Sequence, residues 1–191
     1  MKRFLLGAIA VLLVQGIVGL AYVYSGFFAI SAREPHTHLL WWVTDTTKKN
    51  SIRRGASEIE APPLDDPELI ARGFGVYRNH CLQCHGGPGV GPEPIGRGVY
   101  PPAPSLLPSP EHWDSAELFW IVKNGIKMSA MPAWHFSEDE DDIWAAVAFI
   151  EHMPELTPEQ FQAFGRRATV EAPDRSLSPE RARIGDPEPP P

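Results

Sequence analysis

The residues from Cys81 to His85 have types and a spacing that suit the binding of one cofactor. They read Cys-Leu-Gln-Cys-His. Two thiols three positions apart project from one short helical turn, so each can form a thioether with a vinyl group of haem, and the adjacent imidazole can bind the iron. This is the pattern of covalent c-type haem attachment. Cys81 and Cys84 are the only two cysteines among 191 residues, so the pattern accounts for both.

Two other uses of paired cysteines fit the sequence less well. A thioredoxin-like dithiol needs a βαβ setting, and no such alternation surrounds the pair. A structural zinc site needs four ligands, and the sequence has neither a second cysteine pair nor a nearby His-x-x-x-His. A thiol redox or metal-binding protein without haem therefore stays only as an alternative.

A second axial ligand would complete the coordination of the iron. Small electron carriers commonly pair His with Met, whose thioether raises the reduction potential. Met131 is favoured because Pro132 stiffens the backbone beside it and because it lies in an irregular loop between two predicted helices. Met128, in the same loop, is the competitor. Met153 is set aside because it follows the last core turn of a helix, and three histidines are the bis-histidine alternatives: His80, His112 and His135.

The helix that leads into the motif is well marked. Asp66 is a good N-cap residue, and Pro67 suits the first helical position. Apolar residues recur at helical spacing up to about Cys81. Gly73 inside this helix costs about 1 kcal/mol relative to alanine, so we expect another helix to cross closely there.

The segment after the motif is rich in residues that break regular structure. Six glycines and eight prolines occur between Gly86 and Pro110, which predicts a loop without regular elements, wrapped around the porphyrin rim. Capping boxes then predict two helices, one from Asp114 to Asn124 and one begun by Ser137 and Glu140 that runs to about His152. A short helix from Thr157 to about Arg167 follows. The charged, proline-rich residues 171–191 predict a flexible tail.

The N-terminus predicts a membrane anchor. Lys2 and Arg3 precede an apolar run from Phe4 to Ile30, which is 27 residues, or about 40 Å as a helix, and is enough to span a bilayer. A signal-peptide core has only about 7–15 apolar residues, although cleavage after residues 29–31 stays an alternative. The leading positive charges place the N-terminus inside and the rest on the periplasmic side of the inner membrane. The Trp41–Trp42 pair is interpreted as an interfacial anchor.

Charge narrows the choice of partners. The net charge is −7 and the pI is about 5.5, which argues against nucleic-acid binding. Between Asp66 and Met153 there are 12 acidic and 5 basic residues, again a net of −7. The expected partners are membrane lipid, through the N-terminal helix, and redox proteins that make small, transient contacts.

The segment from Asp66 to about Met153 resembles the class I c-type cytochromes of bacteria. The haem motif carries most of the resemblance. Four further features agree with it, namely Gly73 with Tyr77, Pro104-Ser105-Leu106, Asn124-Gly125-Ile126 followed by Met131-Pro132-Ala133, and Phe149. The long anchored N-terminal segment is similar to that of membrane-bound bacterial cytochromes.

The resemblance implies an all-α domain that encloses one covalent haem c. It implies that His85 and Met131 bind the iron and that the carbonyl of Pro104 accepts a hydrogen bond from His85, with Pro102 as an alternative. The implied organisation is an anchor helix at 1–32, a juxtamembrane segment at 33–65, the cytochrome domain at 66–153, a terminal helix at 154–170 and the tail at 171–191.

The implied function is the transfer of single electrons between redox partners of a respiratory chain by a membrane-tethered cytochrome, which is not an enzyme. One alternative is a haem subunit of a membrane-bound dehydrogenase or oxidase complex. Another is a haem sensor or enzyme whose sixth coordination position is open.

Overall fold

The structure is a computed structural model, and it describes residues 1–171, with side chains to Gly165. The tail predicted at 171–191 lies outside the described residues beyond Glu171. The chain divides into two compact units, of which the first is Met1–His36 and the second begins at Thr37. Each unit is described by itself.

The first unit is built around α1, from Lys2 to Tyr24. This helix has 23 residues, a mean hydropathy of 2.5 and no buried residues, so it is long and apolar enough to cross a membrane. At about 1.5 Å per residue it is about 35 Å long. The prediction that the helix continues to Ile30 is wrong. The hydroxyl of Ser25 donates a hydrogen bond to the carbonyl of Tyr22 (2.6 Å), and Gly26 turns the chain with φ of +72°.

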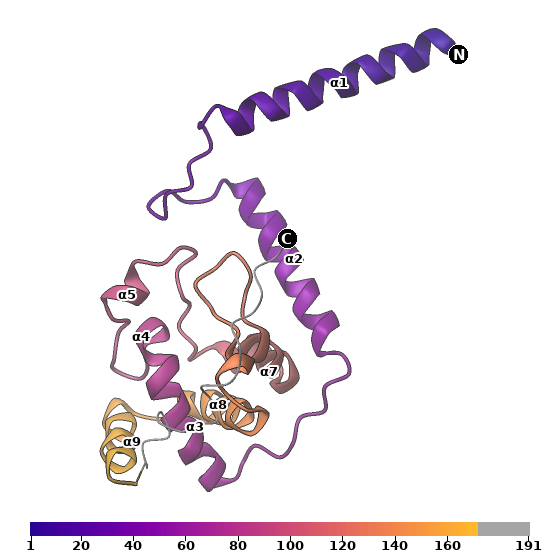
Figure 1. Cartoon of the computed structure of the whole chain (residues 1–191). Coiled ribbons are helices and arrows are strands. Elements are labelled where there is room, and N and C mark those ends of the chain that lie inside the picture. Colours follow the sequence, from indigo (N-terminus) through magenta and orange to yellow (C-terminus); the bar gives the residue numbers. More distant parts are fainter. Residues whose placement is uncertain (172–191) are drawn as a thin grey trace. The chain divides into compact units, whose positions relative to one another are not determined.

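Apart from one isolated β-bridge between Gly87 and Val90, the regular elements described in the second unit are all helices, which confirms the all-α prediction. Its helices are α2 (His38–Ala56), α3 (Pro67–His80), α4 (Leu82–His85), α5 (Pro94–Arg97), α6 (Ser109–His112), α7 (Ser115–Asn124), α8 (Glu140–His152) and α9 (Pro158–Glu171), with the 3₁₀ turns η1 (Trp134–Phe136) and η2 (Met153–Glu155). Figure 1 shows α3 and α8 side by side at the centre, with α2 next to α7.

The crossing of α3 and α8 forms the core. A Cβ atom at Gly73 would overlap the carbonyl oxygen of Ala145, so the two backbones touch, which confirms the close crossing predicted at this glycine. Tyr77 and Phe149 are fully buried on either side of the contact, with ring centroids 5.3 Å apart. The close approach is possible because neither backbone carries a large side chain at the contact point.

The ends of these helices follow mostly from local sequence. Asp66 caps α3, and Asp114 with Glu117 forms a complete capping box on α7, as predicted. The predicted box of Ser137 and Glu140 is wrong. Ser137 instead ends η1, and the carboxylate of Asp139 caps α8 by accepting a hydrogen bond from the backbone N–H of Asp142 (2.8 Å).

The prediction that residues 86–110 contain no regular element is also wrong. The single-turn helix α5 forms within them and α6 begins at Ser109, each with a proline in the first turn, where a missing N–H costs little. Helix α5 packs directly on α4, because Gly96 lacks a side chain and sits against the backbone of Gln83 and Cys84. The loop is therefore tied to the haem motif by a short helix.

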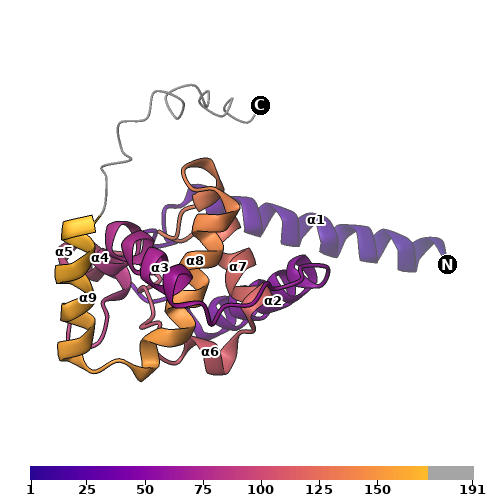
Figure 2. The ribbon, with the colours of Figure 1, turned by 90° about the horizontal axis from the view of Figure 1, so that it is seen from below.

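Two helices flank this core on opposite sides, as both ribbon views show (Figures 1 and 2). Helix α2 lies along α7 and buries Ile52 and Ala56. Helix α9 packs against α3, where Phe161 covers Gly87 and contacts Phe74. Helix α9 runs to Glu171, past the predicted end at about residue 167.

Candidate haem site

One cavity of the second unit brings together all five residues predicted for the haem site, which are Cys81, Cys84, His85, Pro104 and Met131. Most of the remaining lining is apolar. It comes from α7, α8, η1, the segments on either side of α6 and the loop after α7: Val99, Pro101, Pro102, Ala103, Leu106, Trp113, Leu118, Ile121, Val122, Ile126, Ala130, Pro132, Trp134 and Ile150.

The cysteines and the histidine are held on one helical turn. The backbone N–H of Cys81 bonds to the carbonyl of Tyr77 (2.8 Å), and the N–H of His85 bonds to the carbonyl of Cys81 (2.9 Å), so α4 continues directly from α3. Cys81 is 5% exposed. Burial, followed by the nearby Cys84 and Glu138, raises the pKa of the Cys81 thiol to about 12. A free thiol at this position would be protonated and a poor nucleophile at neutral pH, which disfavours thiol redox catalysis.

His85 is oriented by a backbone carbonyl. Its Nδ1 lies 2.8 Å from the carbonyl oxygen of Pro104, to which it donates in the tautomer with a proton on Nδ1, and this leaves Nε2 as the metal-binding nitrogen. Burial lowers the pKa of His85, although the bond to Pro104 acts in the opposite direction. The neutral imidazole, which is the form that binds metals, is therefore favoured. Pro102 also lines the cavity, but Pro104 makes this hydrogen bond.

Tyr77 connects α3 to the chain just after the motif. Its hydroxyl donates a hydrogen bond to the carbonyl of Gly86 (2.7 Å), and the side chain is fully buried. Burial, with a smaller effect of Cys81, raises the pKa of Tyr77 well above its usual range, so the donor stays protonated. Gly86 has φ of +66°, which lets the chain reverse at this point. No local pattern in the sequence indicates this bond.

The loop that carries Met131 is closed by hydrogen bonds within itself. The N–H of Ile126 bonds to the carbonyl of Met131 (3.1 Å), and Ser129 bridges the same two residues through its hydroxyl. Gly125 begins the loop with φ of +65° against the backbone of Pro132. This closure directs Met131 to the cavity. Met128 is at the loop tip with φ of +62°, is 89% exposed, and does not line the cavity.

The other candidate ligands differ in position. His80 lines the cavity, but its Nε2 lies 3.1 Å from a carboxylate oxygen of Glu138. His112 and His135 do not line it and contact the backbone carbonyls of Pro108 and Lys123 through Nδ1. Met153 is fully buried in the core, away from the cavity lining.

Two lining residues, Lys48 and Ile52, come from α2 and were not anticipated. They lie in the segment that the sequence analysis treated as juxtamembrane. No local pattern identifies them, because their proximity to the motif depends on the packing of α2 along α7. Ile52 is 1% exposed, and its burial is the sign that this half of α2 belongs to the domain.

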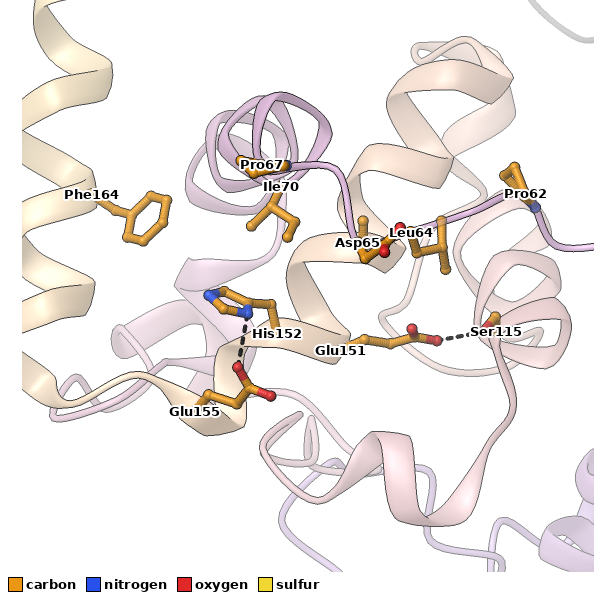
Figure 3. Close-up of a pocket in the computed structure, with 11 residues that line it drawn as sticks. Pro62, Leu64, Asp65, Pro67, Ile70, Ser115, Glu151, His152, Glu155 and Phe164 are labelled. Carbon is orange, nitrogen blue, oxygen red and sulfur yellow. Dashed lines mark hydrogen bonds and ion pairs between the residues drawn. The ribbon is translucent and has the colours of Figure 1, made fainter.

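A second cavity shares no lining residue with the first (Figure 3). Its polar groups pair with one another. Ser115 donates to Glu151 (2.6 Å), and His152 lies 3.1 Å from Glu155. It gathers none of the residues predicted for the haem site.

The lining residues of the first cavity fit a covalently held haem. Two thiols one turn apart, an imidazole with Nε2 available, a thioether and a mostly apolar wall are the donor set and the surroundings that a c-type haem requires. The fold and this site define a small helical haem protein of the c type.

The comparison with known families agrees with this class. Residues 68–150, which are less than half of the chain, match the family described as "Cytochrome C oxidase, cbb3-type, subunit III". No curated protein and no solved structure gives a significant match. The match supports a c-type cytochrome domain at these residues and implies a covalently bound haem c, and α1 fits the anchoring of such a protein in a membrane.

Proposed function

We propose that this protein is a membrane-tethered cytochrome with one haem, which passes single electrons between protein partners of a respiratory chain. The observation that carries the proposal is the single cavity lined by Cys81, Cys84, His85 and Met131. A haem bound there supplies the one-electron chemistry through its iron.

In this proposal each residue at the cavity has a distinct role. Cys81 and Cys84 hold the haem through thioether bonds. His85 and Met131 would bind the iron, and the carbonyl of Pro104 fixes the ring orientation of His85 through Nδ1. An iron held by two side chains would offer no open position to a substrate, which supports electron transfer over catalysis.

The membrane part of the proposal is supported by α1. Lys2 and Arg3 precede its apolar residues, which favours a cytoplasmic N-terminus and a haem domain on the periplasmic side of the inner membrane. The tether keeps the domain near membrane-bound partners, so that small and transient contacts with them are sufficient.

A second candidate function is that of a haem subunit in a membrane-bound oxidase or dehydrogenase complex. The description of the matched family, which names an oxidase subunit, favours it. Gentle solubilisation from native membranes distinguishes the two. A stable complex that co-purifies with the haem protein supports a subunit, whereas a haem protein that elutes alone supports a free carrier.

The proposed function is tested by the haem content of the full chain expressed in a host that matures c-type cytochromes. A pyridine haemochrome spectrum should report one covalent haem for each chain. The Cys81→Ser and Cys84→Ser variants should each lose one thioether and shift that spectrum, and the double variant should hold no covalent haem. Unchanged spectra in both single variants, or a wild-type chain without haem, would contradict the proposal.

A further inference from the structure

Helix α2 contributes to the haem cavity although it lies outside the matched family region, residues 68–150. It is anchored on α7 by buried apolar contacts. Ile52 and Ala56 are 1% and 5% exposed, and Gly55 lies against the ring of Trp120, where a side chain would not fit. One turn before Ile52, the same face of the helix presents Lys48 to the cavity.

Lys48 is unusual among the lining residues because of its charge. Of the described residues that line the cavity, it alone carries a permanent charge, and none is acidic. The haem domain itself has more than twice as many acidic as basic residues. The ammonium group of Lys48 therefore offers a cation to an anionic group of a ligand at the edge of this mostly apolar cavity.

The position of Lys48 is set by Asp45. Its Nζ lies 2.8 Å from one carboxylate oxygen of Asp45, while Nζ of Lys49 lies 2.7 Å from the other. Asp45 is largely buried, with 16% of its side chain exposed, whereas the two lysines are 39% and 48% exposed. One carboxylate thus holds two ammonium groups, and the pair of lysines keeps a net positive charge at this edge of the cavity.

Haem carries two propionate carboxylates, and these are the anions that such a cavity must accommodate. We propose that Lys48 is a positioning residue of the haem site, which binds a haem propionate and raises the reduction potential. The electrostatic reason for the second effect is direct. Oxidation adds a positive charge at the iron, and a nearby cation disfavours that charge more strongly in a low-dielectric cavity than in water.

This inference rests on the proposed function, since it presupposes a haem in the cavity. It adds that α2, which lies outside the residues matched by the family, contributes a binding residue to the site and does not only connect the domain to the anchor. Lys49 offers a matched control because it binds the same Asp45 but does not line the cavity.

The test measures the reduction potential and the resonance Raman band of the propionates in the full-length holoprotein. In Lys48→Gln, we expect a lower potential and a shifted propionate band, with haem still attached. In Lys48→Arg, which keeps the cation, both should stay near wild type, and in Lys49→Gln both should be unchanged.

Two results would overturn the inference. One is a Lys48→Gln holoprotein with wild-type potential and propionate band. The other is an equal shift in Lys49→Gln, which would show that only the overall surface charge matters. A wild-type chain without covalent haem is a different result, because it refutes the proposed function itself.

Discussion

At the scale of single residues, two methionines three positions apart have opposite surroundings. Met131 lines the haem cavity and packs against the core, whereas Met128 is exposed at the tip of the same loop. The difference arises from the closure of the loop through Ile126 and Ser129, which sets the direction of each side chain. This contrast supports the proposal that Met131, rather than Met128, binds the iron.

Replacement of Met131 by alanine should therefore change the electronic properties of the iron. We expect Met131→Ala to remove the Met–Fe(III) charge-transfer band and to lower the reduction potential by about 0.1 V or more, within the range of ~0.8 V that axial ligands span. Visible spectra and redox titration measure both effects. Met128→Ala is the control and should leave both unchanged, and a reversal of the two results would refute the assignment.

Gly73 and Gly75 provide a second comparison, within α3. A methyl group at Gly73 would overlap the backbone of Ala145, while the same group at Gly75 meets nothing within 4 Å. We expect Gly73→Ala to lower the free energy of unfolding by about 3 kcal/mol or more, because the helices must separate. Gly75→Ala should raise it by up to about 1 kcal/mol through helix propensity. Denaturant unfolding of the two holoproteins checks this, and equal stabilities would show that α3 and α8 do not cross at Gly73.

At the scale of elements, α2 and α9 flank the crossing of α3 and α8, and each covers part of the domain. Helix α2 covers one side of the cavity through Lys48 and Ile52, and α9 covers the loop after the motif through Phe161. The first half of α2 differs from the second, because Leu39, Trp41 and Trp42 are largely exposed. Exposed tryptophans shortly after an anchor fit the predicted role at the membrane interface.

The ion pairs of α2 should make its stability depend on pH. The hydrogen bonds from Lys48 and Lys49 hold the pKa of Asp45 below its usual value of 3.8. A carboxyl group whose pKa is lowered by folding stabilises the folded state above its unfolded pKa, and this stabilisation is lost as the pH falls through the folded pKa. We expect Asp45→Asn to lower the free energy of unfolding by about 0.5–1 kcal/mol at pH 7.

The difference in the free energy of unfolding between wild type and Asp45→Asn should become smaller as the pH falls from 5 to below 3.8. Denaturant unfolding followed by circular dichroism over this range measures it, and the use of a difference removes the contribution of the other carboxylates. A difference that stays constant down to pH 3 would show that the pair does not stabilise the fold.

At the scale of the whole molecule, the candidate membrane helix and the candidate haem site lie in different units of the chain. The first unit, Met1–His36, holds the apolar helix, and the second, from Thr37, holds the complete cavity. Since every described residue that lines the cavity belongs to the second unit, this unit should bind haem without the first.

We expect a chain that begins at Thr37, exported by a cleavable signal peptide, to be a soluble holoprotein. Its visible spectrum and reduction potential should match those of the full chain, while the full chain should stay in the membrane fraction. Fractionation and spectroscopy of the two forms check this. A second truncation at residue 58, which removes α2, is the contrasting variant and should weaken haem binding, because it exposes the side of the cavity that Ile52 covers.

Local patterns in the sequence were enough to predict the helical class, the crossing at Gly73 and the capping box of α7. They also indicated Cys81, Cys84, His85 and Met131 for the haem site, whereas Pro104 came from the family resemblance. These features depend on neighbours within a turn or two, or on a glycine that has no other reason to be in a helix. Local patterns failed at residues 86–110 and at Ser137, where prolines began short helices and a nearby Asp139 made the better cap.

The contacts between distant segments depended on tertiary structure alone. It brought Pro104 to His85 across 19 positions and Met131 to the same cavity, and it directed Met128 outward. It also placed Lys48 and Ile52 of α2 in the lining, which no spacing in the sequence indicates. The type of each residue determines the chemistry of its side chain, but which side chains meet depends on how helices pack their apolar faces.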